Sequence, residues 1–121
     1  MGTEATYNNK LISNVTLSGV VSDRIYPIKL PQNITYPCLI YRVDEAVVEG
    51  TLDIEANPTC LYVFENMYYA NSYSQIIAIT DALRDICTEN DWNIDSFVDM
   101  DFDSDVSVFS RVLRISINSN L

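Results

Sequence analysis

Prolines constrain this chain more than any other residues, because three of its four fall between residues 23 and 43. Pro27, Pro31 and Pro37 each fix their own φ angle and push the preceding residue toward extended geometry, so no helix can run through this stretch. The apolar run that follows Pro37 is rich in β-branched and aromatic side chains. It predicts a strand over residues 38–43 that enters a core.

Two helices are expected from the spacing of apolar residues. Ser72 and Gln75 match a capping box, and the apolar residues that follow recur at helical spacing, which predicts a long helix over about residues 72–89. Its stripe consists of Ile76, Ile79, Leu83, Ile86 and Cys87. Thr3 is expected to cap a shorter N-terminal helix that ends before Gly19. The stripe of this second helix consists of Tyr7, Leu11, Ile12 and Val15.

The remaining segments have the patterns of strands. Residues 59–68 are apolar on both faces, which predicts a central strand, and residues 52–56 alternate as a half-buried strand or an exposed hairpin arm. Residues 98–105 and 106–117 alternate on either side of a turn near Ser104, which predicts a C-terminal hairpin followed by a loose tail over 118–121. In the first strand of this hairpin, Val98, Met100 and Phe102 are expected to point one way and the aspartates of residues 99–105 the other. The second is expected to have one face formed by Phe109, Arg111, Leu113, Ile115 and Ile117.

Together these elements predict one α+β domain over residues 1–121. We expect a mostly antiparallel sheet of four to five strands, packed against the long helix and the short N-terminal one, and closing with the C-terminal hairpin. At 121 residues the chain is long enough for a real core.

Charge and composition narrow the classes of function. The net charge is −10, with seven basic residues, seventeen acidic residues and no histidine. Direct nucleic-acid binding needs an excess of positive charge, and Ser-His or Cys-His catalysis needs histidine, so we expect neither. The sequence has no apolar run of about 20 residues, and its N-terminus lacks a basic segment followed by an apolar one, so we expect neither a membrane span nor export by that route. We also expect no enzyme activity and no cofactor.

Neither the cysteines nor the aspartate run predicts a metal site. Cys38, Cys60 and Cys87 are odd in number and widely spaced, so we expect three buried free thiols. The aspartates of residues 99–105 begin like a calcium loop, but serines occupy the positions of the turn glycine and of the bidentate glutamate. A solvated strand face is the favoured interpretation of this acidic run.

The proline-rich stretch also carries a family resemblance. Its segments resemble the N-terminal signature of the tail-completion proteins of long-tailed phages and prophages, which are also described as tail-terminator or tail-to-head joining proteins. The segments are Arg24-Ile25-Tyr26-Pro27, Leu30-Pro31-Gln32 and Tyr36-Pro37-Cys38-Leu39-Ile40-Tyr41. The order of the elements that follow is similar to that of the family, while the acidic residues 44–57 and the strong aspartate run depart from it.

This resemblance implies an α+β domain that forms a ring, commonly a hexamer, at the head-tail junction of a virion. The ring would cap the last ring of major tail-tube protein and meet the head-connector protein, after assembly in the host cytoplasm. DNA would pass through its lumen without specific binding. A lumen lined by aspartates would repel the phosphates of the exiting genome.

Two sets of residues are candidates for such roles, and neither is catalytic or metal-binding. The lumen or a docking face is expected to include Asp99, Asp101, Asp103 and Asp105. The alternative for this set is a solubility face with no role in assembly. An inter-subunit arm is expected to include Glu49, Gly50, Thr51, Asp53 and Glu55.

A second class of function stays open at this point. A small acidic inhibitor or immunity-type protein would cover a basic partner by charge complementarity. Only the net charge supports it. Light scattering distinguishes the two classes, because a stable ring favours the virion protein and a persistent monomer that binds a basic partner 1:1 favours the inhibitor.

Overall fold

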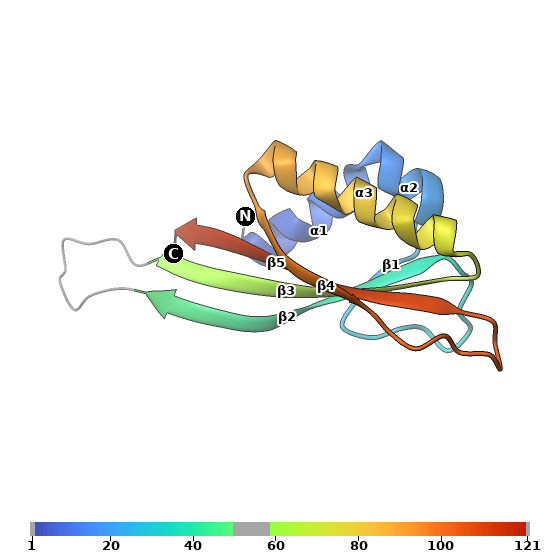
Figure 1. The fold of residues 1–121 in the computed structure, drawn as a ribbon. Coiled ribbons are helices and arrows are strands. Elements are labelled where there is room, and N and C mark those ends of the chain that lie inside the picture. Colours follow the sequence, from blue (N-terminus) through green and yellow to red (C-terminus); the bar gives the residue numbers. More distant parts are fainter. Residues whose placement is uncertain (1, 50–58, 121) are drawn as a thin grey trace, which may run out of the picture.

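The computed structural model describes residues 2–49 and 59–120, which form a five-stranded sheet with three helices on one face (Figure 1). The helices are α1 (Thr3–Ser13), α2 (Val15–Val21) and α3 (Tyr73–Asn90). The strands are β1 (Ile25–Pro27), β2 (Cys38–Glu49), β3 (Thr59–Ala70), β4 (Asn93–Asp99) and β5 (Phe109–Asn120). The α+β class is therefore confirmed, with three helices in place of the two expected.

The strands lie in the order β1-β2-β3-β5-β4. β1 runs parallel to β2, whereas β2 with β3, β3 with β5, and β5 with β4 are antiparallel. The sheet is mixed, so the expectation of a mostly antiparallel sheet is corrected. The parallel pair arises because the proline-rich loop of residues 28–37 returns the chain in its original direction.

The core fills the space between the sheet and the helices. The aromatic ring of Tyr7 on α1 stacks on that of Phe64 on β3, with ring centroids 3.9 Å apart. The predicted stripe of the long helix is confirmed, since all five of its residues are buried. The Oγ atom of Ser72 accepts a hydrogen bond from the backbone N–H of Gln75 at 3.3 Å, as the capping pattern indicated.

The N-terminal helix differs from the prediction. It is interrupted at Asn14, whose side chain accepts a hydrogen bond from the backbone N–H of Leu17 at 2.8 Å and so caps a new helix. This second helix, α2, extends past Gly19 to Val21. The side chains of Ile12 and Val15 are 51% and 83% exposed, so their assignment to a buried stripe was wrong.

The strand expected after Pro37 is confirmed as the start of β2. The guanidinium Nε of Arg24 donates a hydrogen bond to the backbone carbonyl of Pro37 at 2.8 Å, which ties the two ends of the proline-rich loop together. β3 lies between β2 and β5, as its two apolar faces indicated. The cysteines at positions 38, 60 and 87 are buried and free, in agreement with the prediction.

The C-terminal hairpin exists, but its strands are shifted: β4 begins and ends earlier than expected, and β5 begins and ends later. Residues 100–108 form a loop where two strands were expected to meet, and β5 continues to Asn120 where a loose tail was expected. The side chain of Asp103 accepts a hydrogen bond from the backbone N–H of Asp105 at 3.0 Å, and Ser107 has a positive φ of 55°. Both features favour a turn over extended strands.

Candidate interaction surface

The outer edge of the sheet at β4 exposes apolar side chains, where a solvated strand face would carry polar ones. Together with the loop of residues 100–108, β4 forms what we call the β4 edge. Five large apolar side chains here are 48–60% exposed: Phe97, Val98, Met100, Phe102 and Val106. All five lie within residues 97–106 at one edge of the sheet, although Phe97 and Val98 point to opposite faces of it. Exposed apolar side chains gathered at one edge make it a candidate site of interaction with another molecule.

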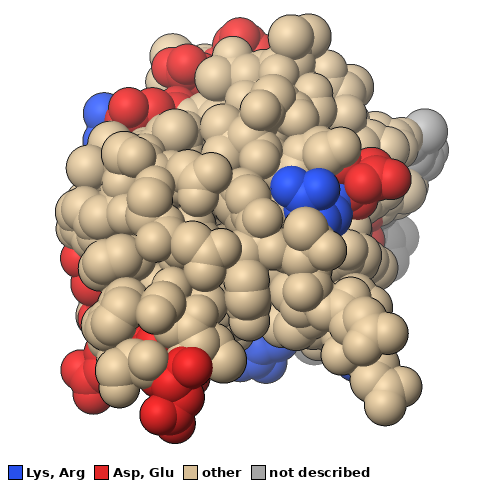
Figure 2. All heavy atoms as spheres, turned by 90° about the vertical axis from the view of Figure 1, so that its right-hand side faces the viewer, with Lys and Arg blue, Asp and Glu red and all other residues tan. Residues whose placement is uncertain are grey.

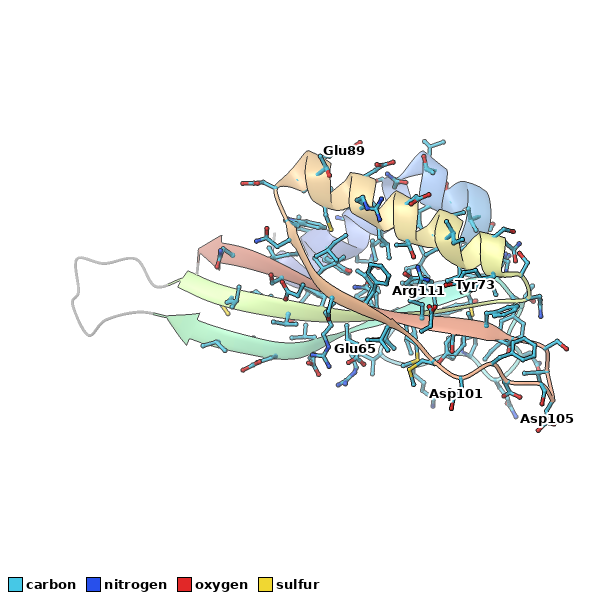
Figure 3. The ribbon with its side chains drawn as sticks, in the orientation of Figure 1. Glu65, Tyr73, Glu89, Asp101, Asp105 and Arg111 are labelled. Atoms are coloured by element: carbon cyan, nitrogen blue, oxygen red, sulfur yellow. The ribbon has the colours of Figure 1, made fainter. Side chains whose placement is uncertain are left out.

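The predicted aspartate set is divided by the structure. Asp99 is the last residue of β4, while Asp101, Asp103 and Asp105 lie in the exposed loop of the β4 edge. Figure 3 shows Asp105 at the tip of this loop and Asp101 at its base. The four carboxylates do not form one face of a strand, because the loop turns between them. This part of the prediction is corrected.

Asp99 is held by a buried arginine on β5. The Arg111 Nε atom donates to Asp99 Oδ1 at 2.6 Å, and the Tyr73 hydroxyl donates to Asp99 Oδ2 at 2.7 Å. Both bonds lower the pKa of the Asp99 carboxyl below its usual value, and the bond from Arg111 has the larger effect. Asp99 is thus a structural ion-pair partner.

Arg111 also joins the β4 edge to the helical layer. Its Nη1 donates to Thr80 Oγ1 on α3 at 3.0 Å, and its Nη2 donates to the Tyr73 hydroxyl at 2.7 Å. The Tyr68 hydroxyl lies 2.6 Å from Thr80 Oγ1, and the Arg111 guanidinium lies 4.8 Å from the centroid of the Phe97 ring. Figure 3 shows Arg111 and Tyr73 together under the start of α3. This network fixes where the exposed loop leaves the sheet.

Sequence reasoning missed this network, although a signal was present. Arg111 lies in an alternating series of β5 whose other members are the half-buried Phe109 and the buried apolar residues Leu113, Ile115 and Ile117. A charged residue in such a series must find a partner when it is buried. Its partners are distant in sequence, so the sequence alone does not identify them.

The sheet face opposite the helices carries a balanced group of charges. Arg42 contacts Asp44 and Glu65, each at 3.2 Å, and Arg114 contacts Glu65 at 3.1 Å and also Asp44. Figure 1 shows that no helix covers this face. Half-buried apolar side chains of three strands lie beside these charges: Ile40, Met67 and Val112. Since the four charges neutralise one another, this face adds little to the negative potential.

The opposite edge of the sheet, which we call the β1 edge, consists of residues 24–32. The side chain of Ile28 is 75% exposed there, and its φ of 67° is rare for a β-branched residue. A hollow of about 340 Å³ lies beside it. Its lining comprises Glu4, Pro27, Ile28, Tyr41, Arg42, Val43 and Phe64.

Figure 2 views the molecule from the end that carries the loop of the β4 edge. Uncharged residues cover most of this end, and acidic side chains gather toward its margins. Among residues 2–49 and 59–120, no group of three or more His, Cys, Asp or Glu side chains could hold a metal ion. Nor does any helix in these ranges have the length and apolar character to cross a membrane.

The predicted inter-subunit arm lies mostly outside the described residues. Glu49 is the last residue of β2. The other members, Gly50, Thr51, Asp53 and Glu55, fall within residues 50–58, which the structure does not describe. The proposed role of this arm therefore stays a prediction.

Comparison with known proteins gives a match in fold but none in sequence family. No model of a protein family matches the chain, and no curated protein matches it. Among solved structures, 19 chains match. One of them belongs to a structure described as the virion of a native gene transfer agent particle, with a TM-score of 0.67 and 11% sequence identity. The alignment covers 98% of this chain and 95% of that chain, so the two share a fold over nearly their whole lengths.

Proposed function

We propose that this protein is a structural component of a phage-like virion and forms a ring at the head-tail junction. The observation that carries the proposal is the shared fold with a chain of a gene transfer agent virion, which extends over nearly all of both chains. The ring would complete the tail, contacting the major tail-tube protein on one side and the head-connector protein on the other. We propose no catalytic role.

The surface of the molecule supports assembly with other chains. The exposed apolar side chains of the β4 edge need a partner to remove them from water. The resemblance of the proline-rich stretch to tail-completion proteins supports the position in the virion, and a six-membered ring follows from the same resemblance. This support is independent of the match in fold.

The charge of the chain suits a channel for DNA. A wall with negative potential repels the phosphates of DNA. It also displaces no counterions from the DNA, which is what drives binding to a basic surface, so DNA passes without binding. Asp101, Asp103 and Asp105 are exposed and available for such a wall. Asp99 is occupied by Arg111, so we restrict the proposed lumen set to the other three.

Deletion of the gene in the genome that produces the particle tests this function. We expect DNA-filled heads and separate tails in electron micrographs, and joined particles again when the wild-type gene is supplied in trans. Joined, transfer-competent particles without the protein would contradict the proposal. A monomer that binds a basic protein 1:1 would support the inhibitor class instead.

Complementation with a variant that carries Asn at positions 101, 103 and 105 tests the lumen. We expect joined particles that release DNA more slowly than wild type. Normal release would remove the lumen role of the three aspartates but leave the structural function standing.

A further inference from the structure

The two outer edges of the sheet have opposite charges. Residues 24–32 of the β1 edge include Arg24 and Lys29 but no acidic residue, whereas residues 93–108 of the β4 edge include five aspartates and no basic residue. The chain has only seven basic residues against seventeen acidic ones, so an acid-free basic segment at one edge is a distinct feature. Each edge therefore attracts the other edge of a second copy more than it attracts its own kind.

The two edges also lie at the same level of the sheet. Ile25 of β1 is in one row with Asp99 of β4, through paired residues of the three strands between them. Pro27 is likewise in one row with Phe97. Strand directions make β4 antiparallel to β1. A second copy placed beside the first in the same orientation would thus set two antiparallel edge strands side by side. Side chains would make this contact, because Pro27 has no N–H, and the N–H of Ile25 and the carbonyl of Pro27 already bond to Asp23 and Lys29.

The apolar surfaces of the edges are complementary in shape. The β4 edge has protruding side chains at the level of β1, namely Phe97 at 48% exposed and Val98 at 60%. The β1 edge has the exposed Ile28 and the hollow of about 340 Å³ beside it. Projecting groups on one edge and a hollow on the other fit a head-to-tail contact, in which each copy uses two different surfaces.

We propose that the β4 edge of one copy docks on the β1 edge of the next copy of this chain. The aspartates of the β4 edge then face Arg24 and Lys29, and the apolar side chains of both edges leave water. A head-to-tail contact of this kind closes into a ring when its rotation permits. The closed ring rests on the proposed function. The contact between two copies rests only on the charge and shape of the two edges.

Site-directed cross-linking tests the contact. The variants Ser96→Cys and Ile28→Cys each place one exposed thiol on one edge, at the same level of the sheet, while the three native cysteines are buried. A short bismaleimide should give covalent dimers when the two variants are mixed, and none when either variant is treated alone. The matched control is Ser96→Cys mixed with Glu89→Cys, because Glu89 lies on the far end of α3 (Figure 3).

The reaction is carried out on the protein alone and on tail tubes to which it is bound. Dimers from the first mixture alone support the proposal. Dimers of Ser96→Cys with itself would indicate a two-fold contact and overturn it. Absence of dimers above the control level in both settings would overturn it as well.

A charge exchange gives a second, independent measurement. Lys29→Glu and Asp95→Lys, at nearby levels of the two edges, should each weaken self-association by about fivefold, and the double variant should regain most of this loss. Sedimentation analysis measures the change, with Glu89→Lys as the control for net charge. Equal effects of Asp95→Lys and Glu89→Lys would exclude edge complementarity.

The outcomes separate this inference from the proposed function. If the edges fail to cross-link but deletion still separates heads from tails, the contact is wrong and the function stands. If the edges cross-link but deletion leaves particles joined, the contact stands and the virion role is wrong.

Discussion

Arg111 shows how single residues shape the exposed part of this molecule. Its side chain is only 8% exposed, and its pKa is raised mainly by the hydrogen bond to Asp99. Removing the Asp99 charge leaves a buried cation with weaker partners, which is destabilising. The carboxylate itself is 45% exposed, so solvent screens part of this effect.

The variant Asp99→Asn should therefore lower the free energy of unfolding at pH 7 by about 1 kcal/mol. Because the pKa of Asp99 is lowered from 3.8 in the folded state, its contribution is fully present above about pH 4 and is lost as the pH falls through the folded pKa. Urea unfolding should thus give a difference between wild type and variant that shrinks at acid pH. The exposed Asp101→Asn is the control, and an equal effect of both variants at pH 7 would contradict the ion-pair role.

The elements follow from the sequence where their patterns are periodic and local. The stripe of α3 and the strands β2, β3 and β5 were predictable because burial on one face imposes a period of 3.6 or 2 residues. The loop of residues 100–108 was not, since the alternation there continues while Asp103 and Ser107 favour a turn. The parallel pairing of β1 escaped prediction because its three residues gain a partner only through the tertiary fold.

Burial of α3 against the sheet provides a test at this scale. Ile79 is fully buried, whereas Ile77, two residues away, is 45% exposed. We expect Ile79→Ala to lower the free energy of unfolding by about 2–5 kcal/mol because it leaves a cavity, and Ile77→Ala by less than about 0.5 kcal/mol. Chemical denaturation measures both values. Similar losses for the two variants would show that α3 does not pack on the sheet through this stripe.

The whole molecule is asymmetric, because its faces and edges differ from one another. Helices cover one face of the sheet, the other face is bare and carries neutralised charges, and the two edges differ in charge and shape (Figure 1). Such a molecule suits repetition in one direction around an axis. The candidate lumen aspartates could be named from the sequence, but their placement in a loop and the loss of Asp99 to Arg111 depend on contacts distant along the chain.

The most direct measurement of the central claim is an electron cryomicroscopy reconstruction of the head-tail junction of the particle that this genome produces. The account predicts a ring of copies of this fold between the tail tube and the head connector, with the β4 edge of each copy on the β1 edge of the next. A junction that contains no copy of this chain would contradict it.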